Sequence, residues 1–190
     1  MRIGIDIDGV LTNMLREMVD YGTKFCYEHG VNYSINLNGY YEDEILGISD
    51  DEVRKFWKEY LLQYMEKCPI RNFASEVISK LNENNDIYII TARNNEGLGE
   101  NDDVQNITKK WLSENNVKYK EIIFSGENKL EVCKQNKIDV MIEDSPKNIM
   151  ELSKEIKVMC FNNQYNSDVE GKNIVRVYSW YDVFRKINKM

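Results

Sequence analysis

The chain has 190 residues, 42% of them hydrophobic and 30% charged, which is enough for one globular core with a modest insertion. Its net charge of −7 excludes the basic surface that binding to a nucleic-acid polymer requires, and no apolar run reaches membrane-spanning length. The four cysteines lack CxxC spacing and His29 is the only histidine, which argues against a zinc site and a disulfide framework and favours the reducing cytoplasm.

The first residues combine an apolar segment with two acids. MRIGI predicts a buried strand over 1–5 that delivers Asp6 and Asp8 to the loop at its exit. Buried carboxylates this close repel each other unless a cation or a proton separates them. A hard divalent metal would do so, because it prefers oxygen ligands. On these residues alone, a turn at Asp8-Gly9 with Asp6 as a cap remains an alternative.

The stretch between Thr12 and Pro69 is helical in pattern. Apolar residues recur at three-and-four spacing from Met14 to Gly30, and the sequence SDDE at 49–52 predicts the start of a further helix. Because no strand is expected here, residues 13–69 are predicted to form a small helical domain. It would be inserted into a core domain of residues 1–12 and 70–190.

After Pro69, apolar and helical segments alternate. Strands are predicted over 87–90, 121–124, 138–142, 158–161 and 174–177. Helices are predicted over 73–85, from Asp102 through Leu112 after a polar loop at 94–101, over 129–136, from Ser145 onward and over 180–187. This alternation predicts an α/β fold with a doubly wound, Rossmann-like parallel sheet flanked by helices.

Polar residues follow four of the predicted strands. In doubly wound sheets ligands bind beyond the carboxyl ends of the strands, where these residues would meet. Each has an ordinary structural explanation when taken alone, as a turn, a solvent charge or a helix start. Their coincidence favours an active site formed by Asp6 and Asp8, Thr91 and Arg93, Ser125 with the following Lys129, and Glu143 and Asp144.

Four motifs occur in the order and spacing of haloacid dehalogenase (HAD) superfamily phosphohydrolases, which the chain resembles. They are DIDGVLT at 6–12, IITAR ending at Arg93, Lys129 ahead of a helix, and IEDSP at 142–146. TAR, the stretch 129–148, and QYN, IVRV and SW near the C-terminus are similar to bacterial nucleotidases of the 5'(3')-deoxyribonucleotidase type. The resemblance covers the sheet well and the insertion poorly, and Glu143 stands where many relatives have Asp.

The resemblance implies a catalytic role for each acid. Asp6 is the expected nucleophile, which forms an aspartyl-phosphate. Asp8 is the expected general acid and base, a task that calls for a raised pKa. Mg²⁺ is the expected cofactor, held by Asp6, the carbonyl of Asp8 and Asp144, with Glu143 acting through water.

The same resemblance implies a phosphate site. Thr91 and Lys129 are expected to bind phosphoryl oxygens, and Lys129 also to stabilise Asp6 as a carboxylate. Gly9 is expected to leave room for the phosphate. Arg93 is expected either to contact the phosphate or to brace its loop.

The expected function is Mg²⁺-dependent hydrolysis of a small phosphorylated substrate, a nucleoside monophosphate. Alternatives are a HAD phosphatase or phosphomutase acting on a sugar phosphate, and a non-catalytic nucleotide-binding module. The presence of both Asp6 and Asp8 argues against the module, and Asp8 argues against a dehalogenase. Self-association into a homo-oligomer is left open, and no membrane partner is expected.

The insertion resembles the cap domains of this superfamily. Anchored after the first strand, it is expected to lie above the carboxyl ends of the strands and to close over the substrate. Tyr40 and Tyr41, in an irregular stretch, are predicted to contribute to leaving-group selection. The aromatic residues at helical spacing are predicted to form the core of the cap instead; these are Phe56, Trp57, Tyr60 and Tyr64.

Overall fold

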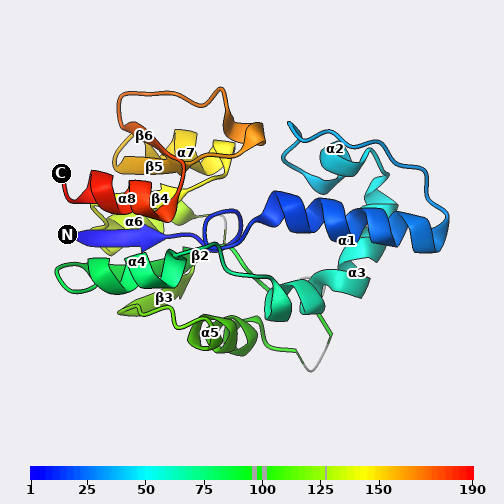
Figure 1. Cartoon of the computed structure of the whole chain (residues 1–190), viewed down its shortest axis with the longest axis horizontal. Helices are drawn as coiled ribbons and strands as arrows, with labels where there is room; N and C mark the ends of the chain where they lie inside the picture. The colour runs from blue at the N-terminus through cyan, green and yellow to red at the C-terminus, as the bar shows by residue number, and fades with distance from the viewer. Residues whose placement is uncertain (96–97, 100–101, 127) are drawn as a thin grey trace.

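In the computed structural model, a parallel sheet flanked by helices forms one half of the molecule (Figure 1). The structure describes residues 1–95, 98–99, 102–126 and 128–190. The 6-stranded sheet has the order β3-β2-β1-β4-β5-β6, and every pairing is parallel. The predicted doubly wound α/β fold is therefore confirmed. Its strands are β1 (Arg2–Ile5), β2 (Asp86–Thr91), β3 (Glu121–Phe124), β4 (Val140–Glu143), β5 (Lys157–Phe161) and β6 (Ile174–Val177).

Helices cover both faces of the sheet. One hydrophobic cluster joins the sheet to α4 (Ala74–Leu81), α5 (Val104–Glu114) and α8 (Trp180–Ile187), and a second joins it to α6 (Lys129–Gln135) and α7 (Pro146–Leu152). In β4 the residues alternate between the clusters, because successive side chains of a strand point to opposite faces. This two-sided burial explains why the central strands are continuously apolar.

The start of α5 differs by one residue from the sequence-based prediction. Asp103, rather than Asp102, is the N-cap, and its carboxylate accepts the backbone N–H groups of Gln105 and Asn106. Asp102 instead accepts the N–H of Gly99. Two adjacent aspartates satisfy the same capping pattern, so sequence alone did not separate them. Part of the predicted loop 94–101 lies outside the described residues.

The residues between β1 and α4 form α1 (Met14–His29), α2 (Glu42–Leu46) and α3 (Asp50–Lys67), which pack around a hydrophobic cluster of their own. Figure 1 shows these helices beyond the end of the sheet toward which β1 runs. The two connections to the sheet half lie side by side, because Thr12 pairs with Ile70 in an isolated bridge. Within the described residues, no helix is both long and apolar enough to cross a membrane.

Candidate active site

A cavity of about 360 Å³ lies between the carboxyl ends of the central strands and the inserted helices. The sheet half contributes Asp6, Asp8, Thr91, Ala92, Arg93, Asn94, Lys129, Glu143 and Asn148, and the insertion contributes Met14, Tyr40, Glu42, Trp57, Leu61, Tyr64 and Met65. Residues far apart in the sequence meet here because parallel strands share one carboxyl edge. Seven of the eleven site residues predicted from the sequence line it; Gly9, Tyr41, Ser125 and Asp144 are the others.

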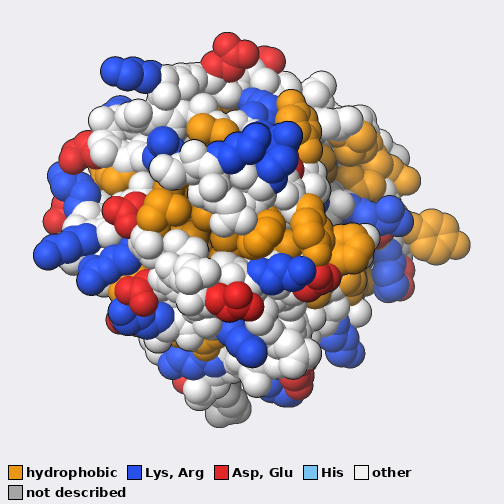
Figure 2. All heavy atoms as spheres, turned by 60° about the vertical axis from the view of Figure 1, so that its left-hand side comes forward, with side chains coloured by type: hydrophobic (Ala, Val, Ile, Leu, Met, Phe, Trp, Pro, Cys, Tyr) orange, Lys and Arg blue, Asp and Glu red, His pale blue; other side chains and the backbone are white. Residues whose placement is uncertain are grey.

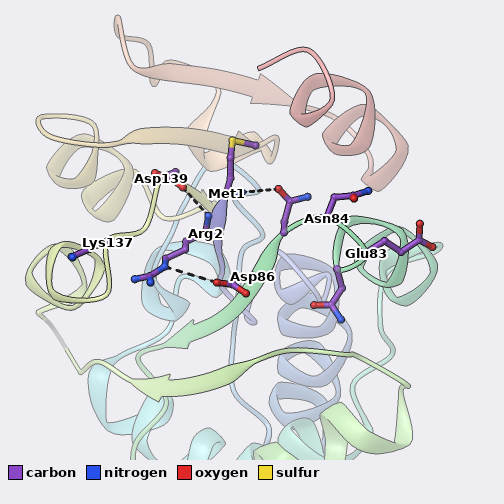
Figure 3. Close-up of a pocket in the computed structure, with 9 residues that line it drawn as sticks. Met1, Arg2, Glu83, Asn84, Asp86, Lys137 and Asp139 are labelled. Carbon is purple, nitrogen blue, oxygen red and sulfur yellow. Dashed lines mark hydrogen bonds and ion pairs between the residues drawn. The ribbon is translucent and has the colours of Figure 1, made fainter.

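A larger cavity of about 750 Å³ lies at the opposite edge of the sheet (Figure 3). Two of its charged groups have partners in the cavity: the N-terminal amine donates to the side-chain oxygen of Asn85, and the Arg2 guanidinium faces Asp86 at 3.9 Å. These side chains lie at the solvent-exposed surface, so their charges are screened. The buried, converging groups are in the smaller cavity, which we take as the candidate active site.

Lys129 links two carboxylates at the centre of the site. Its Nζ donates to Asp6 Oδ1 at 2.8 Å and to Glu143 Oε2 at 2.6 Å, and its side chain is only 4% exposed. Burial would lower the pKa of Lys129, but the charges of the two carboxylates raise it above its usual value. The cation therefore persists at the first residue of α6, where the helix dipole opposes it.

Asp6, Glu143 and Asp144 form a buried carboxylate cluster. One oxygen from each lies within 4.8 Å of the others. Burial and the neighbouring carboxylates raise the pKa of Asp6 to about 7 in spite of Lys129, and they raise the pKa of Asp144 well above its usual value. Such a cluster is stabilised by a cation, and its purely oxygen-containing donor set fits a hard divalent ion such as Mg²⁺.

Gly9 is held in a conformation that suits glycine. Its φ is +85°, and a Cβ added there would lie 1.9 Å from Asp144 Oδ2. Gly9 therefore allows Asp144 to approach the loop after β1, in addition to the room for phosphate expected from the sequence.

Asp8 is held by groups from both halves of the chain. Arg93 donates to its two oxygens at 2.9 and 2.7 Å, and the Tyr64 hydroxyl of α3 donates to Oδ1 at 2.7 Å. Although burial raises the pKa of Asp8, Arg93 and Tyr64 bring it below its usual value. The raised pKa expected for Asp8 is wrong for this arrangement, because Arg93 and the Tyr64 hydroxyl outweigh the effect of burial.

Two expectations for single residues are refined by these contacts. Arg93 braces Asp8, and its Nη1 is buried without a hydrogen-bond partner among the described residues. Tyr64 was expected only as core of the insertion; it is buried, but its hydroxyl also contacts Asp8 and Thr12. Helical spacing predicts burial but not the partner of a terminal hydroxyl.

The two adjacent tyrosines that were expected to select the leaving group differ. Tyr40 lines the cavity and its ring packs edge-on against Tyr165 at 5.2 Å, whereas Tyr41 is 53% exposed and is not part of the lining. Tyr165 in turn donates its hydroxyl to Asp144. The sequence marked 164–166 as a point of resemblance but gave Tyr165 no role.

Arg71 was not singled out from the sequence. It donates to the carbonyls of Thr12 and Gly9 at 2.8 and 3.0 Å and to Asn163 at 3.2 Å. It therefore fixes the loop that follows Asp6 to the returning connection at Ile70. The nearby Pro69 marked the end of the insertion, but a single arginine after it carried no signal of this contact.

The chain matches known proteins over its whole length. A family model described as "5' nucleotidase, deoxy (Pyrimidine), cytosolic type C protein" matches residues 1–190. Nucleotidase CA_C3379 of Clostridium acetobutylicum is 28% identical over 195 residues, which cover 100% of this chain and 95% of that protein.

Solved structures share the fold. The HAD-like family hydrolase SP0104 of Streptococcus pneumoniae has a TM-score of 0.68 at 13% identity, covering 98% of this chain and 97% of its own. YfnB of Bacillus subtilis, crystallised bound to magnesium, has a TM-score of 0.59 at 12% identity and covers 98% of each chain. At these identities the two structures bear on the fold alone.

Proposed function

The chain belongs to the 5' nucleotidase, deoxy (pyrimidine), cytosolic type C family and is a phosphoric monoester hydrolase of the HAD superfamily; we propose that it hydrolyses a nucleoside monophosphate, with Mg²⁺ and through an aspartyl-phosphate. The observation that carries this proposal is the buried network in which Lys129 joins Asp6 to Glu143 beside Asp144. We also propose that it acts in the cytoplasm.

In the first step, a carboxylate oxygen of Asp6 attacks phosphorus and the bond from phosphorus to the nucleoside oxygen breaks. Protonated Asp8 gives its proton to that leaving oxygen. In the second step, Asp8 takes a proton from water as the water oxygen attacks phosphorus. The bond between Asp6 and phosphorus then breaks, which releases phosphate, restores Asp6 as a carboxylate and leaves Asp8 protonated for the next cycle.

Asp8 must gain a proton to start this cycle. Its contacts with Arg93 and Tyr64 favour the ionised form. A substrate phosphate that draws the guanidinium toward itself would weaken this stabilisation and let the pKa of Asp8 rise. The buried Nη1 of Arg93 is a suitable donor for such a phosphate oxygen.

The metal would be held by Asp6, the carbonyl of Asp8 and Asp144, with Glu143 in support. When bound, Mg²⁺ supplies positive charge that offsets repulsion between carboxylates and phosphate. The oxygen-only cluster of Asp6, Glu143 and Asp144 supports this assignment. Thr91, Lys129 and the backbone at Gly9 would bind phosphoryl oxygens, and residues 13–69 would act as the cap over residues 1–12 and 70–190.

The experiment is a screen of purified protein against nucleoside monophosphates and sugar phosphates with Mg²⁺, scored by release of inorganic phosphate. We expect the highest kcat/KM for a nucleoside monophosphate. A sugar phosphate as best substrate would contradict the nucleotidase assignment, and transfer of phosphate between sugar positions without release would indicate a phosphomutase. Binding of nucleotides without turnover would indicate a binding module.

A further inference from the structure

The walls of the candidate active site differ in chemistry. The sheet half supplies Asp6, Asp8 and Lys129, which handle the phosphate in the proposed function. The opposite wall comes from the insertion and contains apolar side chains, among them Met14, Trp57 and Leu61. Glu42 lies in this second wall. A carboxylate among apolar side chains is unfavourable unless something compensates it.

The helix that carries Glu42 does not by itself explain its position. All the residues in the first turn of α2, Glu42, Asp43 and Glu44, are acidic and favourable for its dipole. Glu44 caps the helix, because its carboxylate accepts the N–H groups of Tyr40 at 2.9 Å and Tyr41 at 3.2 Å. Asp43 is exposed to solvent. Of these three acids, Glu42 is the one that lines the cavity.

The surroundings of Glu42 leave its negative charge largely uncompensated. Burial raises the pKa of Glu42 and the charge of Asp43 raises it further, while hydrogen bonding from its own backbone N–H and from the Trp57 side chain lowers it. No cation among the described residues contributes to this balance. Since a carboxylate accepts about four hydrogen bonds, Glu42 retains acceptor capacity toward the cavity.

We infer that Glu42 determines which leaving group the enzyme accepts, an inference that rests on the proposed function. It favours a neutral leaving group that presents an N–H or O–H donor, as a nucleoside does, and it rejects one that carries a second negative charge. Trp57 in the same wall offers an aromatic surface for a base. The substrates would therefore be nucleoside monophosphates rather than nucleotides with a further phosphate or phosphorylated carboxylic acids.

The charge selectivity is tested with Glu42→Gln, which keeps the size of the side chain and removes its charge. For each protein, kcat/KM is measured for phenyl phosphate and for 4-carboxyphenyl phosphate, which differ by one distant negative charge. We expect the wild-type protein to prefer phenyl phosphate. In the variant, the ratio of kcat/KM for phenyl phosphate to kcat/KM for 4-carboxyphenyl phosphate should be roughly tenfold lower. Asp43→Asn removes the neighbouring, exposed charge and is the matched control, which should keep the wild-type ratio.

The hydrogen-bond acceptor is tested with Glu42→Met. We expect kcat/KM for a nucleoside monophosphate to fall roughly tenfold relative to phenyl phosphate, whose leaving group has no donor. A variant that merely folded poorly would lose activity on both substrates together and leave the ratio unchanged.

Several outcomes would overturn the inference and are distinguishable. If the wild-type protein hydrolyses no phosphate ester with Mg²⁺, the proposed function fails and the inference fails with it. If it hydrolyses these esters but Glu42→Gln keeps the wild-type ratio, only the inference fails. An equal change of ratio in Asp43→Asn would show a general effect of negative charge and would also overturn it.

Discussion

Two aspartates that stand two positions apart have opposite environments. Asp6 lies in a cluster of buried acids, where burial raises its pKa to about 7 although Lys129 contacts it. Asp8 is paired with Arg93 and Tyr64, and its pKa is below the usual value. The direction of these shifts is opposite to what the proposed roles need, since a nucleophile must be ionised and a general acid protonated. A divalent cation at the carboxylate cluster would favour ionised Asp6, and a substrate phosphate that draws Arg93 away would let the pKa of Asp8 rise.

The nucleophile assignment is tested by Asp6→Asn. The amide keeps the shape of the side chain but lacks the carboxylate oxygen that would attack phosphorus, so we expect kcat to fall at least about a thousandfold. Phosphate release measures the loss, and circular dichroism checks that the variant is folded. Wild-type turnover by the folded variant would show that Asp6 is not the nucleophile.

The contact between Tyr64 and Asp8 is tested by Tyr64→Phe. The ring still fills its buried position, but the hydrogen bond to Asp8 is lost, and a bond to a charged group contributes about 1.5–3 kcal/mol. Loss of this bond lets the pKa of Asp8 rise but leaves its carboxyl group less well positioned over the leaving oxygen. We expect the loss of positioning to dominate, so that kcat for a nucleoside monophosphate falls roughly tenfold with a smaller change in KM.

Tyr60→Phe is the matched control for this variant. Tyr60 is a buried tyrosine of the same helix, and its hydroxyl donates to Glu28 rather than to a residue of the cavity. It should retain wild-type kcat. Equal losses in the two variants would mean that Tyr64 acts through the packing of α3 and not through Asp8.

At the scale of elements, the connection that precedes α2 brings one tyrosine into the site and leaves its neighbour outside. Tyr40 lies against Tyr165, which contacts Asp144, whereas Tyr41 is mostly exposed. The same short segment presents Glu42 to the cavity. This segment and Tyr64 of α3 therefore supply polar groups of the insertion to the site, while the other lining residues of α1 and α3 are mainly apolar.

This difference predicts distinct effects for Tyr40→Ala and Tyr41→Ala. We expect Tyr40→Ala to lower kcat/KM for a nucleoside monophosphate roughly tenfold more than for phenyl phosphate, because it removes a contact remote from phosphorus. Tyr41→Ala should change that ratio less than about twofold. The two substrates are compared at equal Mg²⁺. Parallel losses on both substrates in Tyr40→Ala would mean that Tyr40 only supports the position of Tyr165.

At the scale of the whole molecule, negative charge dominates, with 32 acidic against 25 basic residues. The buried part of that charge is concentrated where the sheet meets the insertion, around Asp6, Glu143 and Asp144. An anionic substrate must approach against this field, so bound cations are needed to offset it locally.

The concentration of buried negative charge around Asp6, Glu143 and Asp144 predicts that activity depends on a metal ion. We expect activity to require Mg²⁺ and to be lost in excess chelator, and we expect Mg²⁺ to raise the melting temperature because it binds the folded cluster. Differential scanning fluorimetry with and without Mg²⁺ measures the second effect, and Asp144→Asn should abolish the shift. Full activity in chelator, or a melting temperature that does not respond to Mg²⁺, would contradict the proposed metal site.

One face of the molecule bears a band of hydrophobic side chains bordered by charged ones (Figure 2). Exposed aromatic residues of the chain include Phe73, Tyr178 and Tyr181, which are 62%, 67% and 44% exposed. The ring centroids of Phe73 and Tyr181 lie 5.8 Å apart. Self-association, which the sequence left open, would bury such side chains. Sedimentation velocity measures it directly.

The order of strands and helices along the chain could be predicted from the sequence, because hydrophobic periodicity, caps and turn residues are local properties. It also predicted the HAD resemblance, which is confirmed by the family match over residues 1–190. The residues at the strand ends could be grouped in advance for a physical reason: parallel strands place their carboxyl ends at one edge. Asp6, Thr91, Lys129 and Glu143 meet there.

The side chains that contact Asp8 could not be predicted from the sequence and follow from the packing of the folded chain. Arg93 and Tyr64 are 85 and 56 positions away from it in the sequence, and such contacts depend on how the insertion packs against the sheet. Periodicity assigned Tyr64 to a core because a buried tyrosine and a site tyrosine have the same spacing. Glu42 likewise resembles the acids beside it in sequence, and what distinguishes it is the cavity that the folded chain places in front of its carboxylate.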